Sequence, residues 1–341
     1  MDYQKLAESI KRHIENRPRD ASAYTDLFSL CRQWEEENFQ KAHALNKELR
    51  VMAAKQLRLA SPSEAERFYE AWRKSLLFDA PHNFDAFMTY IELDRKPEKR
   101  FYAPRRHYLK PMVQGFQDIL DKKLRLLTIS MPKRAGKSQT GINFVNMLSG
   151  KFPDRSTLME GTGDDLVKSF YNGCLEYLTV PNEDLFYGAD TKIINLKSKS
   201  RFPTIMCRSI DARQVGLSEA TNVLYLDDCV EGREEAKNRQ RLDDKWEVIS
   251  GDIMGRAIEG TPMVFTGTRY SIYDPIGRIQ EYAEQQGWAW RAIEIPALDP
   301  ITDESNYEYE REGQKIFTTA YFREQRELLS AAQFESEFQQ Q

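Results

Sequence analysis

Hydrophobic positions divide the chain into two regions with different periods. Up to about residue 97, apolar residues recur at steps of three and four, as in amphipathic helices. The helices that this spacing predicts span Tyr3–Ile14, Ala21–Glu37, Phe39–Leu59 and Ser63–Leu77. Ser63 fits an N-cap, and Glu66 completes a capping box. We therefore predict an α-helical accessory region over residues 1–97, which reveals no chemistry of its own.

From Leu124 onwards, short apolar runs alternate with amphipathic segments. This alternation favours a mainly parallel sheet with helices on both faces. The expected strands are Leu124–Ser130, Ser156–Glu160, Thr204–Ser209, Asn222–Leu226, Pro262–Thr266 and Ala289–Ile295. The expected helices lie near Lys137–Leu148, Asp164–Thr179, Arg233–Val248 and Pro275–Gln285, with a hairpin insertion at Lys192–Met206. We assign an α/β domain to residues 98–315 and a helical tail or linker to residues 316–341.

Composition narrows the class of protein. With 341 residues, 40% of them hydrophobic and 30% charged, the chain has the composition of a soluble globular protein. It shows neither an apolar run of membrane-spanning length nor the apolar core of a signal peptide. Its four cysteines form no closely spaced pairs, so we expect reduced, buried thiols and an intracellular protein.

A net charge of −4 gives no general attraction to nucleic acid. Any contact with DNA would depend on local basic patches. The patch that we expect for this role is formed by Lys197, Lys199 and Arg201.

The first chemical signal is a basic turn between the first predicted strand and the next helix. Pro132 ends the strand, because proline cannot donate to a sheet ladder. In a strand–loop–helix layout of this kind, backbone N–H groups and a lysine bind the β- and γ-phosphates, and a hydroxyl ligates Mg²⁺. The expected nucleotide-binding residues are Lys133, Arg134, Ala135, Gly136, Lys137, Ser138 and Gln139. Met131 stands where such loops usually have their first glycine, so the turn alone also fits an ordinary exposed loop.

A second apolar strand ends in two carboxylates, Asp227 and Asp228, about ninety residues after Ser138. Such a pair lies at the carboxyl edge of a sheet, beside the phosphate loop. Asp227 would then hold Mg²⁺ together with Ser138, and Asp228 would orient or deprotonate the attacking water. An additional strand between the two motifs suggests the branch of P-loop ATPases in which a catalytic carboxylate follows the metal-binding one.

A third strand ends in Thr266, Gly267, Thr268 and Arg269. Hydroxyls at a strand tip can sense the γ-phosphate and pass its loss to the next helix, so we interpret this segment as a coupling element. Taken by itself, the segment fits equally a strand that ends in a polar turn, with Arg269 in a structural ion pair.

The charged stretch from Arg95 to His107 predicts a linker into the α/β domain. It also admits a nucleotide-base clamp, in which Tyr102 stacks on adenine and Arg106 reads its edge. The alternative interpretation is a solvated basic connector.

Together these motifs resemble the large terminase subunits of tailed bacteriophages, the ATPases that pump double-stranded DNA into procapsids. The resemblance rests on three stretches: Met131-Pro-Lys-Arg-Ala-Gly-Lys-Ser, Leu226-Asp-Asp-Cys-Val-Glu-Gly-Arg-Glu-Glu-Ala and Thr268-Arg-Tyr-Ser-Ile-Tyr-Asp-Pro-Ile-Gly-Arg. It implies a P-loop ATPase that uses ATP and Mg²⁺, assembled as a homo-oligomeric ring on a portal with a small terminase subunit, in the host cytoplasm.

Carried over by position, the resemblance makes Arg134 the loop arginine and Arg213 the candidate arginine that reaches a neighbouring subunit's nucleotide. Asp228 stands where many relatives have a catalytic glutamate. Because aspartate is one methylene shorter, Glu234 is the second candidate, with Glu231 and Glu235 also possible. Terminases of this kind usually continue into a nuclease domain; no cluster of acids for one follows Gly277, so we expect no nuclease activity from these residues.

Two other functions fit parts of the sequence. One is a helicase or remodelling ATPase acting on nucleic acid, which shares the acids at the strand ends but needs a second lobe. The other is a non-enzymatic protein in which the helical region mediates interactions. Loss of Mg²⁺-dependent ATP hydrolysis on replacing Lys137 would separate an enzyme from a scaffold.

Overall fold

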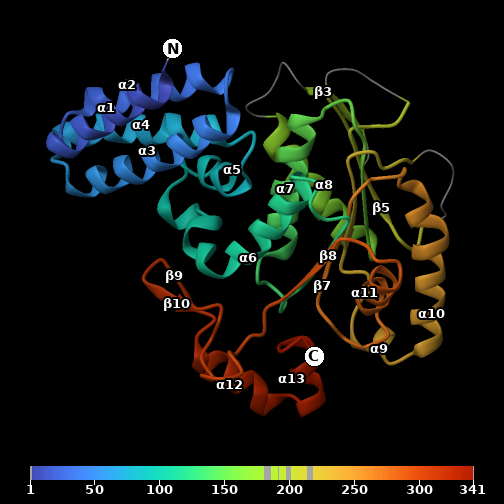
Figure 1. The fold of residues 1–341 in the computed structure, drawn as a ribbon. Helices are drawn as coiled ribbons and strands as arrows, with labels where there is room; N and C mark the ends of the chain where they lie inside the picture. The colour runs from blue at the N-terminus through green and yellow to red at the C-terminus, as the bar shows by residue number, and fades with distance from the viewer. Residues whose placement is uncertain (1, 180–185, 191, 197–200, 213–217, 341) are drawn as a thin grey trace. The chain divides into compact units, whose positions relative to one another are not determined.

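The computed structural model describes residues 2–179, 186–190, 192–196, 201–212 and 218–340. The chain forms two compact units, Met1–Arg95 and Lys96–Gln341, and each is described by itself (Figure 1).

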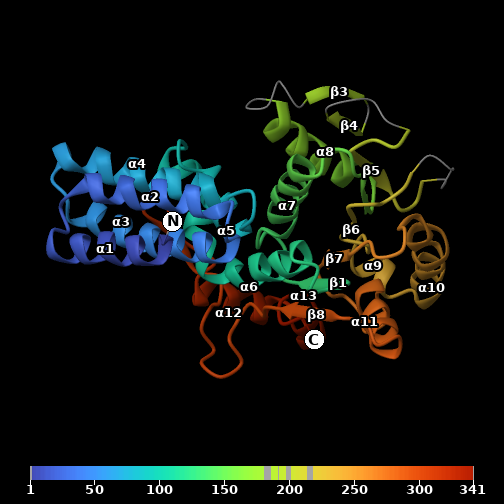
Figure 2. The same cartoon turned by 45° about the horizontal axis from the view of Figure 1, so that its top comes forward.

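The first unit is a bundle of helices (Figure 2). They are α1 (Tyr3–Asn16), α2 (Ala21–Glu35), α3 (Phe39–Leu59), α4 (Pro62–Asp79) and α5 (Phe84–Tyr90). Its core is the apolar stripe of each helix, with Leu27, Leu49 and Phe68 almost fully buried. The predicted capping box was placed two residues too late. Ser61 caps α4 with Glu64 as its partner, because Pro62 fits the first helical position.

An eight-stranded sheet forms the centre of the described part of the second unit. Its strands are β1 (Leu126–Ser130), β2 (Thr157–Gly161), β3 (Phe186–Asp190), β4 (Ile193–Leu196), β5 (Ile205–Ser209), β6 (Val223–Asp227), β7 (Met263–Gly267) and β8 (Trp290–Glu294). Their order is β3-β4-β5-β2-β6-β7-β1-β8. The six strands from β5 to β8 in this order are parallel, whereas β4 pairs antiparallel with both β3 and β5. Strand β7 therefore lies between β1 and β6.

Alternate residues of the central strands face different helices, which gives the unit three layers (Figure 1). On one face are α6 (Tyr102–Leu120), α7 (Lys137–Lys151) and α8 (Asp164–Thr179). The other face carries α10 (Arg239–Glu247) and α11 (Pro275–Gln285), packed on a cluster that includes Leu126 and Leu224. The predicted α/β class, with a mainly parallel sheet and helices on both faces, is confirmed.

Helix α7 lies close to the sheet at Gly141. A Cβ atom at this position would lie 2.0 Å from the hydroxyl of Tyr225 on β6, so only glycine permits the observed packing. This approach fixes the start of α7, and therefore the basic turn, against the ends of the strands.

The sequence pattern did not reveal helix α6. Its basic start, with Arg105, Arg106 and His107, was taken for a linker, and Pro111 within the helix weakened the pattern further. The helix predicted over Arg233–Val248 is interrupted, because Asn238 ends one segment (α9, Arg233–Ala236) and caps the next.

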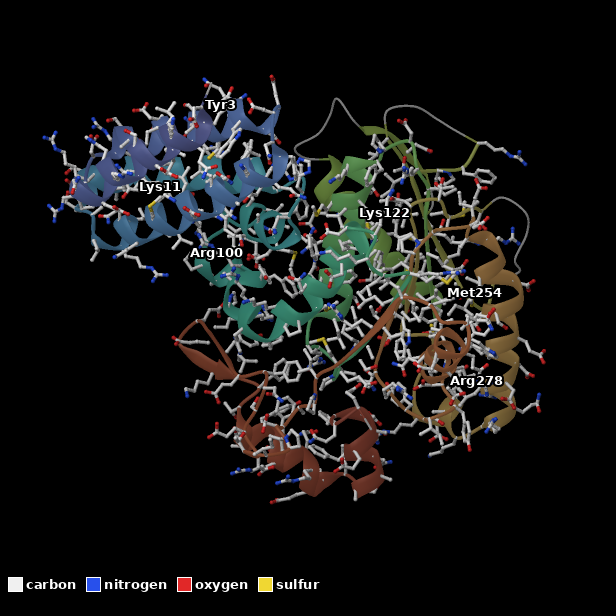
Figure 3. The ribbon with its side chains drawn as sticks, in the orientation of Figure 1. Tyr3, Lys11, Arg100, Lys122, Met254 and Arg278 are labelled. Carbon is white, nitrogen blue, oxygen red and sulfur yellow. The ribbon has the colours of Figure 1, made fainter. Side chains whose placement is uncertain are left out.

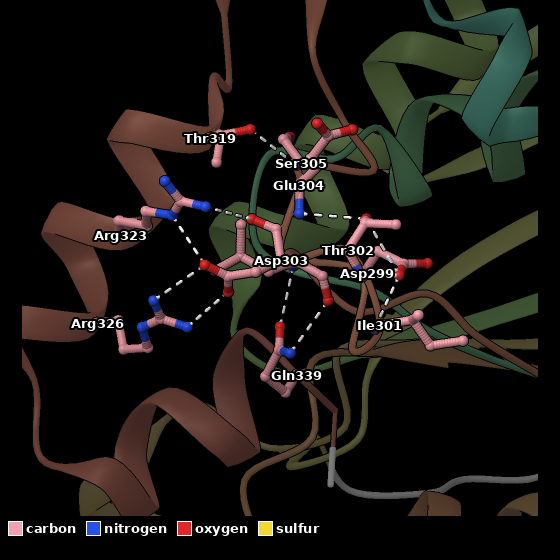
Figure 4. A network of polar contacts seen from close by, with 11 residues as sticks. Asp299, Ile301, Thr302, Asp303, Glu304, Ser305, Thr319, Arg323, Arg326 and Gln339 are labelled. Atoms are coloured by element: carbon pink, nitrogen blue, oxygen red, sulfur yellow. Dashed lines mark hydrogen bonds and ion pairs between the residues drawn. The ribbon is translucent and has the colours of Figure 1, made fainter.

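The last part of the chain forms the two-stranded ribbon β9 (Tyr309–Arg311) and β10 (Gln314–Ile316), then α12 (Thr319–Leu328) and α13 (Ala331–Glu337). Asp303 accepts from Arg323 and Arg326 of α12, and Gln339 bonds to the backbone of Leu298 (Figure 4). These contacts fasten the C-terminal segment to the loop after β8.

No helix in the described ranges combines the length and apolar character needed to cross a membrane. All four cysteines are buried and free of disulfide bonds.

Candidate nucleotide-binding site

A cleft of about 370 Å³ opens at the carboxyl ends of β1 and β6. Parallel strands with a crossover between them leave such a cleft, where ligands of α/β proteins bind. Its walls come from the basic turn, from the loop after β2 and from the loop after β6. The lining residues are Lys133, Arg134, Gly136, Lys137, Ser138, Gln139, Thr162, Leu166, Asp228, Val230, Glu231 and Tyr270. Of the loop residues expected to bind nucleotide, Ala135 alone does not line the cleft, because it is buried.

The basic turn has a constrained backbone. Gly136 has φ +100° and caps α7, and Arg134 has φ +63°. A Cβ atom on Gly136 would also lie 2.9 Å from the ring of Phe101. Both the positive φ and this close contact therefore require glycine here. The turn brings the first N–H groups of α7, which have no partner within the helix, to the cleft.

The Lys137 ammonium is buried beneath the turn. It donates to the carbonyl oxygens of Met131 (2.8 Å) and Pro132 (3.2 Å) and to the hydroxyl of Thr268 (3.2 Å). Burial lowers the pKa of Lys137, and the negative charges of Asp228 and Asp227 oppose this effect. The lysine and both carboxylates therefore lie at the same end of the sheet.

Asp227 is fully buried at the end of β6. Its Oδ1 accepts a 2.5 Å hydrogen bond from the Thr266 hydroxyl on β7. Burial raises the pKa of Asp227 to about 6, and the charge of Asp228 adds to the rise, whereas Thr266, Ser138 and Lys137 act in the opposite direction. Its Oδ2 is buried without a hydrogen-bond partner. A buried, unsatisfied carboxylate oxygen near a serine hydroxyl fits the oxygen ligands of Mg²⁺.

Asp228 lies in the cleft and has a left-handed backbone, with φ +43°. Its Oδ1 accepts from the N–H of Thr268 (3.2 Å), and its carbonyl oxygen accepts from the Thr162 hydroxyl (2.7 Å). A non-glycine residue in this conformation stores strain that the neighbouring bonds must hold. The carboxylate is thus fixed in position by β7 and by the loop after β2.

The structure does not bring Glu234 to the cleft. Its side chain is 87% exposed and pairs with Lys237. Glu235 also points elsewhere, because its carboxylate forms an ion pair with the ammonium of Lys245 at 2.6 Å. Of the three glutamates considered, Glu231 is therefore the one that lines the cleft with Asp228, where it is exposed.

The predicted coupling segment touches both groups of the site. Thr266 binds Asp227, and Thr268 joins Lys137 to Asp228 through its hydroxyl and its N–H. Gly267 lies between them, where a Cβ would be 3.4 Å from the Asp228 carboxylate. Arg269 instead forms a structural ion pair with Asp274, at 2.9 Å, as one interpretation of the sequence expected.

The expected base clamp is wrong for Tyr102. This ring is 1% exposed inside the second unit, so it cannot stack on a base. Arg106 is exposed on α6 and does not line the cleft. The aromatic residue that reaches the loop is Phe101, which caps α6, whereas Tyr102, the first residue of the helix, enters the core.

Three other expected residues, Arg213, Lys197 and Lys199, lie outside the described ranges. Arg201 is exposed, with its guanidinium 5.1 Å from the ring centroid of Phe202.

Sequence reasoning missed three groups around the cleft. Thr162 follows β2 and could have been found from its place at a strand end. Tyr270 stands in the third motif stretch but was given no role there, yet its ring lies 5.2 Å from the Lys133 ammonium. Glu337 is buried and pairs with Arg233 and Lys133, a contact between residues distant in the sequence that no local pattern reveals.

The sequence matches no protein-family model, and a search of curated proteins gave no match. Among solved structures, the chain is similar to the large terminase of bacteriophage HK97, with a TM-score of 0.49 and 10% sequence identity. The similarity covers 69% of this chain and 50% of the terminase chain, so this chain spans about half the length of that protein.

Proposed function

We propose that this protein is an ATPase that drives translocation of double-stranded DNA, as the large subunit of a phage terminase does. The observation that carries the proposal is the convergence of Lys137, Asp227 and Asp228 at one end of the sheet, with β7 between them. The sequence motifs that resemble those of terminases supply the link to DNA packaging.

In this proposal, the triphosphate lies over the first turn of α7, where the N–H groups of the helix end and Lys137 meet its β- and γ-oxygens. Lys137 is buried below this turn and donates to two carbonyl oxygens, which the phosphate oxygens would replace on binding. Ser138 and Asp227 would hold Mg²⁺, which would neutralise charge on the phosphates. Asp228 orients the attacking water and accepts its proton, and Arg134 meets the charge that develops on the transferred group.

Two features support Asp228 as the residue that acts on water. Its carboxylate lines the cleft, whereas that of Asp227 is buried, and its Oδ1 is held by Thr268 on the neighbouring strand. These positions divide the roles of the two adjacent acids. The buried Asp227 would hold the metal ion, and Asp228, which lines the cleft, would act on water.

The decisive experiment measures Mg²⁺-dependent ATP hydrolysis by the full chain and by Lys137→Ala. We expect loss of at least about 100-fold in kcat, since a group that stabilises phosphoryl charge is removed. Lys168→Ala, an exposed lysine on α8, is the matched control and should retain the full rate. An unchanged rate in Lys137→Ala excludes the assignment.

A second experiment tests the DNA substrate. Linear duplex should stimulate hydrolysis, and the stimulation should fall as salt rises, because phosphate contacts release counterions. Equal hydrolysis with and without duplex would exclude a translocase, and strand separation would favour the helicase alternative. An isolated subunit that hydrolyses ATP as fast as the assembled ring would exclude an arginine supplied by a neighbour.

A further inference from the structure

The first unit contains a cluster of metal-binding side chains far in sequence from the nucleotide site. Glu35 is the last residue of α2, His43 lies in the first turns of α3, and His82 follows α4. One ligand atom from each of these residues lies within 4.8 Å of the other two. We propose that Glu35, His43 and His82 form a three-ligand site for a divalent transition metal, with Zn²⁺ as the ion that best fits the ligands.

The distance between two of the ligand atoms already matches metal coordination. In a tetrahedral zinc site with bonds of about 2.0–2.1 Å, ligand atoms lie about 3.3–3.4 Å from one another. The Nε2 atom of His43 and the Oε1 atom of Glu35 are 3.2 Å apart. The third ligand, from His82, has to move by roughly 1.5 Å at most, which a rotation of its imidazole in the turn after α4 supplies.

A carboxylate behind His43 completes the arrangement. Nδ1 of His43 lies 2.6 Å from Asp79, which is buried and held by Arg50 at 2.7 Å. Histidine ligands of metals commonly donate their second N–H to a carboxylate, which fixes the tautomer and directs the other nitrogen at the ion. Here that nitrogen points at Glu35.

Aromatic rings surround the imidazoles. Phe78 stacks on His43 at 4.5 Å, and Phe39 lies 4.1 Å from His43 and 4.9 Å from His82. An apolar shell strengthens metal–ligand interactions by excluding water, while the partial exposure of His82 leaves a path for entry. Two imidazoles and one carboxylate suit Zn²⁺, with the fourth position left to water.

Such a site would join three parts of the bundle. Its ligands come from the end of α2, the start of α3 and the turn after α4, so one ion would cross-link the segments that connect these helices. Because the ion binds only the folded arrangement, it should stabilise the first unit in proportion to its concentration.

The test is a titration of the chelator-treated full chain with Zn²⁺, in excess Mg²⁺ so that the nucleotide site does not compete. We expect one bound ion per chain, a rise in the midpoint of thermal unfolding, and slower hydrogen exchange in α2 and α3. His82→Gln should weaken Zn²⁺ binding at least about 100-fold, and Asp79→Asn about 10–100-fold. His13→Ala, the other histidine of the same unit, is the control and should bind as the parent does.

Circular dichroism without metal shows whether each variant is folded. If His82→Gln is not, Glu35→Gln replaces it, since its amide keeps the size of the side chain. Zinc affinity equal in the parent and in the folded ligand variants would overturn the proposal. The proposal also fails if the parent binds no Zn²⁺ at micromolar concentration, in which case His43 serves only as a charged bridge between Glu35 and Asp79.

Discussion

Replacing Asp227 with asparagine should make the metal-free protein more stable while abolishing its proposed activity. The carboxyl is fully buried, and one of its oxygens has no hydrogen-bond partner. Burial raises its pKa to about 6 from an ordinary value of 3.8. A folded protein that binds its proton more tightly than the unfolded chain loses stability as the pH rises from about 4 to 6.

The size of the effect follows from the same two values. A pKa difference of one corresponds to about 1.4 kcal/mol, so ionised Asp227 lowers the free energy of unfolding by up to about 3 kcal/mol above pH 6. The asparagine avoids this term but removes one of the two negative charges near Lys137. We therefore expect a gain of about 1–3 kcal/mol at pH 7.5 and almost none at pH 4.

The assay is urea unfolding of the full chain in a metal chelator, at both pH values. Hydrogen exchange of peptides from β1, β6 and β7 reports the second unit separately, which matters because two units can unfold independently. Asp303→Asn is a control of opposite sign. Arg326 and Arg323 lower the pKa of Asp303, so this stabilisation is present at neutral pH and lost as the pH falls. An Asp227→Asn protein no more stable than the parent at pH 7.5, or equally stabilised at pH 4, would refute the reasoning.

Three further predictions concern other parts of the second unit and the thiols. Gly141→Ala should lower the free energy of unfolding by about 1–3 kcal/mol, seen as a lower melting temperature, because the added Cβ would meet the hydroxyl of Tyr225. The control is Gly150→Ala in the same helix. No atom lies within 4 Å of its added Cβ, so it should be neutral or stabilising. Glu337→Gln should speed hydrogen exchange of α13, because the buried carboxylate loses its ion pair with the partly exposed Arg233, a change of about 1 kcal/mol; unchanged exchange, as expected for the exposed Glu335→Gln, would contradict this. None of the four thiols should react with a disulfide reagent before denaturation, and one fast-reacting thiol in the native protein would show that the burial is wrong.

Local pattern was enough to predict the central sheet and the residues at its carboxyl ends. Buried parallel strands are continuous apolar runs, so β1, β6 and β7 stand out, and their polar ends mark the site. The local sequence pattern could not predict which residue each side chain contacts in the folded protein.

The failures have physical causes of this kind. Phe101 and Tyr102 are adjacent aromatic residues at the start of α6. Which of the two rings enters the core depends on where this helix begins and how it packs. Glu234 and Glu231 are both acidic residues after the same strand, and the exposed pairing of Glu234 with Lys237 appears only once the chain is folded. Glu337 reaches the site from the far end of the chain, which no window of sequence contains.

The end of β7 lies in the middle of a chain of polar contacts. Figure 3 draws the side chains of the described residues on the ribbon. Thr266 forms a hydrogen bond with Asp227, and Thr268 forms one with Lys137. The next residue, Arg269, forms an ion pair with Asp274, whose carboxylate caps the first turn of α11. The four consecutive residues Thr266–Arg269 thus connect the buried Asp227 carboxylate and the buried Lys137 ammonium to the start of α11. This helix lies on the face of the sheet opposite α7. A change of charge at Lys137 or Asp227 therefore has a direct covalent and hydrogen-bonded route to α11, with no need to deform the hydrophobic layers on either side.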